Sequence, residues 1–357
     1  MQFKNSSHYR STNIPKKCSL CRRQLKRFPW KTLSVDPVKT SRAMNISTTS
    51  NSPSIDVRFY LFTQLATGIS LVILSPITVI SNLLLLLTIY KDPLKCFRTP
   101  ASYLIIALGC VDFTTGLVIE PLFVAYRLAS YLKWSLYPGR SYESLLRTGS
   151  SISTVGLNLS FLLVLALIWT QFLAITHPQR YRSAITTRRI LVFVGISTLY
   201  FTGFTLLQFI GVSRRSLLQI NLHFHATVIT ILLFVGSAIL LRSLRRFAKE
   251  SRQNEDDEGL RQLTVATLLL SAILIACTLA HIITLNFWFY TELETPQDTL
   301  HLSAAITIAD EMLFIKVASD AFVYAWRLPY YRKSLKLVLT RARQQIGNEA
   351  TEMVTMA

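Results

Sequence analysis

Seven long apolar segments alternate with polar connectors along the chain. A helix of about 20 apolar residues crosses a bilayer, and each segment approaches or exceeds that length. Prolines stand between several of them, at Pro93, Pro100, Pro178 and Pro296, where they favour helix ends. The segments cover residues 60–90, 101–126, 150–176, 190–212, 220–242, 260–290 and 300–325. This pattern predicts an all-α membrane protein built as a bundle of seven transmembrane helices.

The distribution of Lys and Arg predicts the orientation of this bundle. With the N-terminus outside, the inner connectors and the C-terminal tail hold 19 basic residues, and the outer loops hold six. Because Lys and Arg gather on the cytoplasmic side of membrane proteins, we expect an extracellular N-terminus and a cytoplasmic C-terminus. The expected location is the plasma membrane.

The composition agrees with a protein dissolved in lipid. Hydrophobic residues make up 51% of the 357 residues and charged residues 16%, below the roughly 25% charged residues of soluble domains. The net charge of +19 does not indicate nucleic acid, because the basic residues lie in short connectors and in the N-terminal tail. Anionic lipid headgroups are the expected partner. No cluster of His and Cys has the spacing of a metal site, and we expect no cofactor.

Three domains follow from this pattern. Residues 1–59 are expected to form a basic, disordered extracellular tail, residues 60–326 the membrane domain, and residues 327–357 a cytoplasmic amphipathic helix and tail. Sequons at Asn45 and Asn5 predict glycosylation of the tail. An alternative is that translation begins at Met44, which would leave a short polar tail that still contains Asn45.

The segment after the seventh apolar run predicts a short eighth helix. Pro329 is favourable at a first helical position. Tyr331 and Leu335 then share one face, and Arg332 and Lys333 lie on the other. We expect this amphipathic helix to lie on the inner membrane surface.

Several residues on these segments resemble those of the rhodopsin-like (class A) G-protein-coupled receptors. The resemblance covers roughly residues 60–340, and its elements occur in the family's order. They are Asn82 in the first segment, Leu108 and Asp112 in the second, His177-Pro178 with Arg180-Tyr181 after the third, and Asp320, Tyr324, Ala325 and Arg327 followed by Pro329 and Arg332 at the end of the seventh. The chain is therefore identified as a divergent member of that family.

The departures from the family's pattern concern signalling. Thr170-Gln171-Phe172 stands where the family has Asp/Glu-Arg-Tyr, so the arginine that would contact a G protein is missing. Cys277-Thr278-Leu279-Ala280 replaces the family's Cys-Trp-x-Pro. The family's outer disulfide cannot form either. The resemblance places the G-protein-facing surface at Thr170, Gln171, Phe172, Arg180 and Arg182.

Ionisable residues inside apolar segments are the strongest candidates for function, since each costs about 2.5–3.5 kcal/mol to insert at a helix centre. Asp112, Lys316 and Asp320 form such a set, and Lys316 lies four residues before Asp320 on one helix face. One interpretation is an internal ion pair. The alternative is that the Lys316 side chain extends to the membrane interface.

The resemblance gives this set a more specific interpretation. In the family, a sodium ion is held between helices 2, 3 and 7, and Asp112 and Ser160 match two of its polar positions. We expect the Lys316 ammonium to replace sodium and to pair with Asp112 and Asp320. The expected intramembrane pocket comprises Asn82, Asp112, Ser160, Lys316, Asp320 and Tyr324. The family's retinal-binding lysine would fall at Phe314, which argues against an opsin.

The outer halves of the segments should line a ligand cavity. Ser153 occupies the position where amine receptors carry an aspartate, so a standard monoamine is not favoured. Glu120 and Asp310 nevertheless favour a cationic ligand or a basic peptide, unless Asp310 and Glu311 simply reach water. The expected pocket residues are Glu120, Ser153, Thr154, His281 and Asp310.

Together these features predict a receptor that transduces an extracellular ligand signal to a heterotrimeric G protein across the plasma membrane. The alternative is a receptor-fold protein that does not activate G proteins and acts as a ligand scavenger or receptor partner. An enzyme or transporter is not favoured, because no HExxH or GxSxG motif is present.

Overall fold

The protein consists of helices throughout the part of the chain that can be described. The computed structural model describes residues 55–95, 97, 99–132, 140–250, 255–291 and 295–356. The helices are α3 (Ile55–Lys91), α4 (Pro100–Thr114), η1 (Thr115–Ile119), α5 (Glu120–Leu132), α6 (Arg140–Thr176), α7 (Pro178–Ala184), α8 (Thr187–Leu206), η2 (Leu207–Ile210), α9 (Arg214–Ile220), η3 (Asn221–Val228), α10 (Ile229–Glu250), α11 (Glu255–Tyr290), α12 (Pro296–Arg327) and α13 (Pro329–Met356).

Six stretches of continuous helix in the described residues are long and apolar enough to cross a membrane. They are Val57–Lys91, Pro100–Leu132, Arg147–Thr176, Thr187–Ile210, Arg214–Lys249 and Glu258–Tyr290. Helix α12 has 32 residues, but charged residues between Asp310 and Asp320 interrupt its apolar character, and it is not among the six. The chain is therefore a multi-pass membrane protein.

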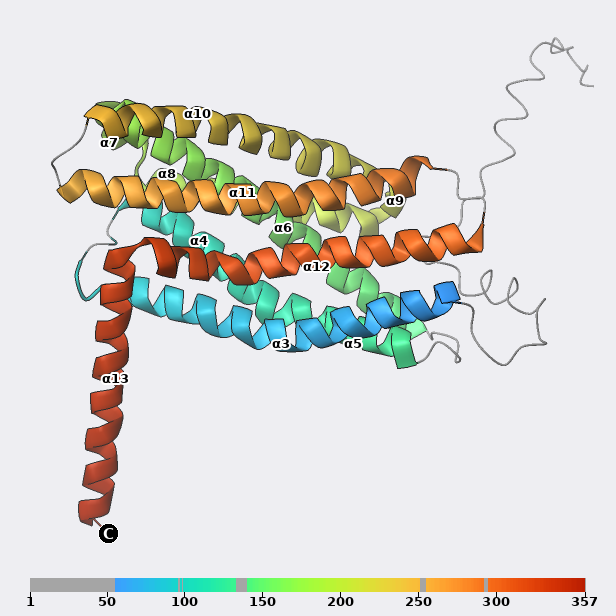
Figure 1. The fold of residues 1–357 in the computed structure, drawn as a ribbon, viewed down its shortest axis with the longest axis horizontal. Helices are drawn as coiled ribbons and strands as arrows, with labels where there is room; N and C mark the ends of the chain where they lie inside the picture. Colours follow the sequence, from blue (N-terminus) through green and yellow to red (C-terminus); the bar gives the residue numbers. More distant parts are fainter. Residues whose placement is uncertain are drawn as a thin grey trace, which may run out of the picture.

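The long helices form one bundle, and α13 leaves it at a steep angle (Figure 1). Helix α12 packs along α3 on one side and α11 on the other, and α6 contacts α4, α8, α10 and α11. Leu163, Val164 and Leu167 on α6 are fully buried, which makes α6 the centre of the core. Helix α8 is the least buried of the six apolar helices.

Prolines and capping residues fix where several helices begin. Pro100, Pro178 and Pro296 occupy the first turns of α4, α7 and α12, where the missing N–H costs no hydrogen bond. Thr295 and Asp298 form a reciprocal capping box at the start of α12.

Two wide π-helical turns interrupt the second and fifth membrane helices. In η1 the Glu120 N–H bonds to the Thr115 carbonyl five residues earlier. Pro121 follows directly, and its ring would clash with the carbonyl four residues before it in a regular α-helix. In η3 the Thr227 hydroxyl donates to the Leu222 carbonyl at 2.7 Å, which satisfies a carbonyl within the wide turn. The first turn matters most, because it sets the direction of Glu120.

The predicted boundaries at the two ends differ from the structure. Helix α3 begins at Ile55, inside the predicted tail of residues 1–59, because no breaker separates Ile55 from the apolar run. The rest of that tail, with Asn5 and Asn45, lies outside the described residues. Helix α13 has 28 residues rather than forming a short helix, since no proline follows Pro329.

Helix α13 is anchored to the bundle by its first turns. Tyr331 and Ser334 are 2% and 0% exposed, and burial raises the pKa of the Tyr331 phenol above its usual value. Arg332, Lys333 and Lys336 are exposed. The first part of α13 therefore has one buried face and one basic face.

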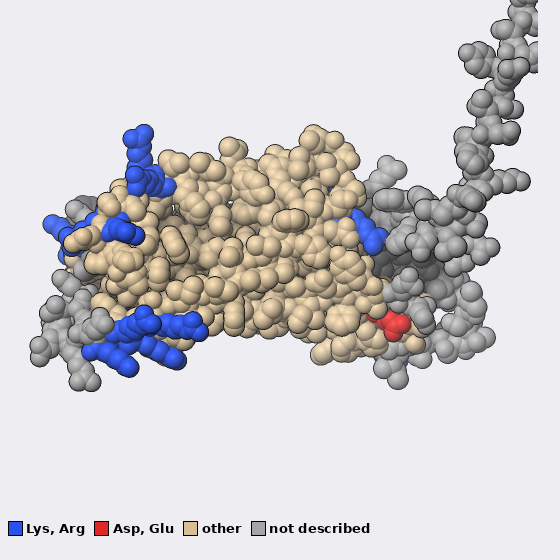
Figure 2. Space-filling model, turned by 90° about the horizontal axis from the view of Figure 1, so that it is seen from above, with Lys and Arg blue, Asp and Glu red and all other residues tan. Residues whose placement is uncertain are grey.

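Most visible Lys and Arg residues gather at one end of the molecule (Figure 2). This is the end at which α12 meets α13 in Figure 1. The band between the two ends shows almost no charge on the face in view. Such segregation is typical of a protein whose middle faces hydrocarbon.

Candidate functional site

A buried ion pair lies in the middle of α12. The Lys316 ammonium is 2.6 Å from Asp320 Oδ2 and donates a hydrogen bond to Ser160 Oγ on α6 at 2.7 Å. Both charged side chains are 1% exposed. The ammonium therefore ends inside the bundle and not at its surface. Because the Lys316 and Asp320 positions are four residues apart on one helix, they face the same side.

Asp112 on α4 belongs to the same buried region. It is 1% exposed and interacts electrostatically with Asp320 and Lys316. No donor among the described residues bonds to its carboxyl oxygens, but its carboxyl group lies within hydrogen-bond reach of that of Asp320. Asp112 and Asp320 thus share the single ammonium of Lys316.

The remaining predicted members of this pocket are buried as well. Asn82 is 0% exposed and Tyr324 is 1% exposed. The Asn82 amide donates to the Thr78 carbonyl at 3.0 Å, while Asn82 Oδ1 and the Tyr324 hydroxyl have no partner among the described residues. Unsatisfied polar atoms of this kind are expensive in a bilayer, which marks the region as a candidate functional site.

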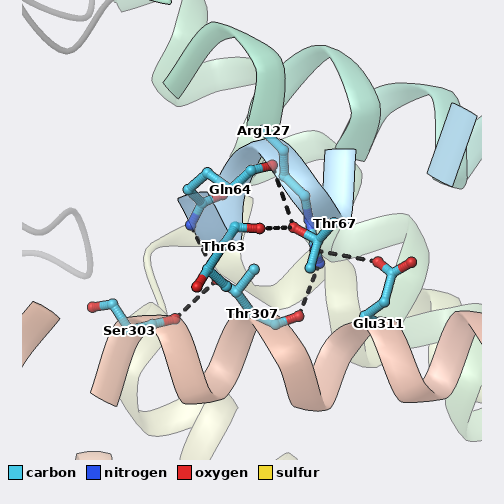
Figure 3. Close-up of polar contacts among 7 residues, drawn as sticks. All are labelled: Thr63, Gln64, Thr67, Arg127, Ser303, Thr307 and Glu311. Atoms are coloured by element: carbon cyan, nitrogen blue, oxygen red, sulfur yellow. Dashed lines mark hydrogen bonds and ion pairs between the residues drawn. The ribbon is translucent and has the colours of Figure 1, made fainter. Parts of the chain in front are cut away.

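A second ion pair, which the sequence analysis missed, lies between α5 and α12. Arg127 Nη1 is 3.3 Å from Glu311 Oε2, and Arg127 Nη2 donates to the Thr307 carbonyl at 3.3 Å. The two side chains are 2% and 9% exposed. Gln64 on α3 donates to Thr307 Oγ1 at 3.1 Å. Figure 3 shows these contacts between α3, α5 and α12, with the nearby Thr63, Thr67 and Ser303.

The sequence carries a signal for this pair. The predicted second segment ends at residue 126, directly before Arg127. Arg127 follows Glu120 by seven residues, or about two helical turns, which places both on one helix face. A helix that continued for two more turns would have placed Arg127 inside the bundle.

The predicted ligand-pocket residues lie in different surroundings. His281 Nδ1 on α11 lies 3.1 Å from Asp310 Oδ1 on α12, and the two side chains are 21% and 27% exposed. Thr154 lines a cavity of about 40 Å³ with Ser150, Gln208 and Arg214. Ser153 is 7% exposed, and Glu120 is fully buried. The His281–Asp310 pair is therefore the charged group of this set that remains open to an approaching molecule.

The predicted G-protein-facing residues divide into buried and exposed groups. Gln171 on α6 is 1% exposed and accepts a hydrogen bond from Thr264 on α11 at 3.3 Å. Thr170 is 3% exposed, and Phe172 is half-buried. Arg180 and Arg182 are exposed. Gln171 thus joins α6 to α11, and the two arginines remain free to contact other molecules.

Comparison with known proteins supports a relationship over part of the chain. No protein-family model matches. The chain is 28% identical over 138 residues, 39% of its length, to the muscarinic acetylcholine receptor DM1 of Drosophila melanogaster. It is 29% identical over 125 residues, 35% of its length, to the muscarinic acetylcholine receptor M3 of Sus scrofa, and 28% identical over 163 residues, 44% of its length, to that of Pongo pygmaeus.

The chain covers only a small part of these relatives. The matches span 16%, 20% and 25% of the lengths of the three receptors. The relatives are receptors and not enzymes. Over these partial matches the chain is similar to muscarinic acetylcholine receptors, which are rhodopsin-like (class A) G-protein-coupled receptors.

Proposed function

We propose that the protein is a rhodopsin-like receptor that transduces an extracellular ligand signal across the plasma membrane. The observation that carries this proposal is the similarity to muscarinic receptors in a chain with six apolar membrane helices. A receptor of this kind has two helix packings, and a ligand that binds one of them better shifts the balance. Residues 60–326 would form the receptor domain.

Helix α12 is the proposed seventh membrane span. It is long enough, and it lies side by side with α3 and α11 within the bundle (Figure 1). Its charges would prevent insertion if they faced lipid. Glu311, Lys316 and Asp320 are instead 7%, 1% and 1% exposed, and each has an ion-pair partner. Pairing within the protein offsets their cost in a membrane.

Helix α13 is the proposed eighth helix on the inner membrane surface. Its steep angle to the bundle (Figure 1) is the orientation expected of a helix lying along a bilayer. The exposed Arg332, Lys333 and Lys336 would face anionic headgroups. The basic end in Figure 2 supports a cytoplasmic C-terminus and an extracellular N-terminus. The N-terminal tail, glycosylated at Asn5 and Asn45, would then be extracellular.

The Lys316 ammonium takes the place of a bound sodium ion in this proposal. It already contacts Ser160 and Asp320, and it acts electrostatically on Asp112. Because this internal cation cannot dissociate, the stability of the bundle should not depend on the sodium concentration. The pocket formed by Asn82, Asp112, Ser160, Lys316, Asp320 and Tyr324 would then be a structural centre and not an ion-binding site.

The proposed ligand is a cation. The relatives are acetylcholine receptors by name, and acetylcholine carries a positive charge. Ser153 cannot pair with such a charge, but the Asp310 carboxylate is partly exposed beside His281. We therefore place the cationic group of the ligand at Asp310.

We propose that the receptor activates a heterotrimeric G protein. Substitution of Gln171 provides a test of this proposal. Cells that express the chain would be screened with cationic ligands, and G-protein dissociation would be measured after surface display had been checked. We expect a ligand-dependent response that increases at least severalfold in Gln171→Arg, because arginine restores the missing positive charge. Asp310→Asn is the matched variant that should abolish the response of both proteins.

The same experiment distinguishes the alternative. Ligand binding with no G-protein response from the wild type or from Gln171→Arg would favour a scavenger or receptor partner. No binding of any cationic ligand would contradict the proposed ligand class.

A further inference from the structure

Glu120 is fully buried, and among the described residues it has no charged partner. It is 0% exposed, and its Oε2 atom has no hydrogen-bond partner among the described residues. Its position depends on the wide turn η1, in which its N–H bonds to the Thr115 carbonyl. This turn directs Glu120 toward α3, where its Oε1 atom lies 3.1 Å from Thr78 Oγ1.

Helix α3 and the wide turn η1 pack closely against each other beside Thr78. Ser75 donates to the Gly116 carbonyl at 2.8 Å. A Cβ atom added at Gly116 would lie 2.9 Å from Thr78 Cβ and Thr78 Cγ2. The backbone of η1 therefore touches the Thr78 side chain directly, and Glu120 extends from the end of this contact.

The hydrogen bonds of Thr78 indicate which atom carries a proton. Thr78 Oγ1 lies 3.0 Å from the Leu74 carbonyl oxygen and 3.1 Å from Glu120 Oε1. A threonine hydroxyl has one proton to donate, and in a helix it commonly donates to the carbonyl four residues earlier. An ionised Glu120 could only accept, so the two acceptors would compete for one proton. A protonated Glu120 donates to Thr78 Oγ1, which then donates to Leu74, and both contacts become hydrogen bonds.

The charges around Glu120 lead to the same assignment. The buried cations of the described residues are Arg127 and Lys316. Arg127 pairs with Glu311, and Lys316 pairs with Asp320. The groups that act electrostatically on Glu120 from neighbouring helices are the carboxyls of Glu311 on α12 and Asp112 on α4. The buried set thus contains four carboxyls and two cations. A further negative charge at Glu120 would face carboxylates on two sides without a counterion.

We propose that Glu120 is a proton-binding site, in which a neutral carboxylic acid donates a hydrogen bond to Thr78 and holds α5 against α3. The bound proton removes the charge of one of the two carboxyls for which the cluster has no cation. Loss of the proton would leave an unpaired carboxylate between α3, α5 and α12 and would weaken the packing of these helices. This inference does not depend on the ligand or on coupling to a G protein.

Infrared spectroscopy of the full chain in lipid nanodiscs tests the assignment. At neutral pH we expect a carbonyl stretching band of a protonated carboxylic acid that disappears in Glu120→Gln. In Thr78→Val the band should remain but shift to higher frequency, because its hydrogen-bond acceptor is lost. Asp298→Asn, at an exposed position on α12, should leave the band unchanged. The Asp112→Asn variant shows how much of the infrared band comes from the Asp112 carboxyl and how much from Glu120.

Thermal unfolding of the same proteins provides a second measurement. Because removal of the proton destabilises the fold, the unfolding temperature of the wild type should decrease as the pH rises. The unfolding temperature of Glu120→Gln should decrease less over the same pH range. Glutamine has the shape of the neutral acid and can donate to Thr78, so this variant should fold. The proposal is overturned if Glu120→Gln fails to fold, if it instead removes an ionised-carboxylate band, or if its stability has the same pH dependence as that of the wild type.

Discussion

Individual buried charges determine the chemistry of this protein, and each is constrained by its partner. Lys316 and Asp320 form one pair, and Arg127 and Glu311 form the other. A buried pair adds little net stability, because the cost of removing both ions from water offsets their attraction. Removal of one partner is costly, since the other charge remains buried and unpaired. Single and double substitutions should therefore have very different effects.

Lys316→Met should lower the free energy of unfolding by about 3–5 kcal/mol, because it leaves Asp320 without its cation. The double variant Lys316→Met/Asp320→Asn should recover a large part of this loss. Thermal unfolding of the purified protein in detergent measures both effects. Equal stabilities of the single and double variants would show that the pair does not act as a unit.

The sodium dependence of stability is a second prediction at this scale. A ligand that binds only the folded state raises its stability in proportion to the logarithm of the ligand concentration. We expect the wild type to unfold at the same temperature in sodium chloride and in N-methylglucamine chloride of equal ionic strength. Lys316→Asn should be more stable in sodium, because it exchanges the internal cation for a neutral polar group. A clear sodium shift in the wild type would refute the proposed role of the Lys316 ammonium.

At the scale of helices, the close contact between α3 and η1 leaves little space for a larger side chain at Gly116. Gly116→Ala should destabilise the protein by about 1–3 kcal/mol, because its Cβ would overlap the side chain of Thr78. Gly195 on α8 is the matched control, since a Cβ there would meet no atom within 4 Å. Gly195→Ala should be neutral or stabilising by up to about 1 kcal/mol. Unfolding temperatures that rank the two variants in the opposite order would refute the packing argument.

The attachment of α13 to the bundle depends on adjacent tyrosines that differ in burial. Tyr331 is 2% exposed and Tyr330 is 41% exposed. Tyr331→Ala should therefore cost about 3 kcal/mol through the cavity that it leaves, whereas Tyr330→Ala should change stability by less than about 0.5 kcal/mol. Hydrogen exchange of the α13 amides measures the local effect. Equal exchange in both variants would mean that α13 is not held by Tyr331.

At the scale of the whole molecule, the number of crossings decides between a receptor and other membrane proteins. Six apolar helices and α12 together give an odd number of spans if α12 crosses the membrane. Epitope tags at the two ends should then be detected on opposite sides of the membrane in intact and permeabilised cells. Tags on the same side would remove α12 from the membrane and with it the proposed receptor function.

Local features of this protein follow from its sequence, whereas features that depend on packing between helices do not. Of the prolines predicted to separate the segments, Pro100, Pro178 and Pro296 lie at helix starts, where a missing N–H costs no hydrogen bond. Pro93 lies in the turn after α3. The pairing of Lys316 with Asp320 could be predicted from the sequence because the two residues lie on one helix. The direction of the Glu120 side chain could not be predicted, since a wide turn before Pro121 rotates it toward α3. Arg127 was missed because one helix continued six residues beyond its predicted end.

The sequence by itself determined which stretches are apolar enough to enter a membrane, because hydropathy is a property of consecutive residues. It also located the charges that must be buried. Only the tertiary structure decided how those charges are satisfied, since Arg127 and Glu311 are separated by 184 positions along the chain. Their contact depends on how α3, α5 and α12 are rotated and packed against one another, and this rotation depends on the side chains of all three helices together.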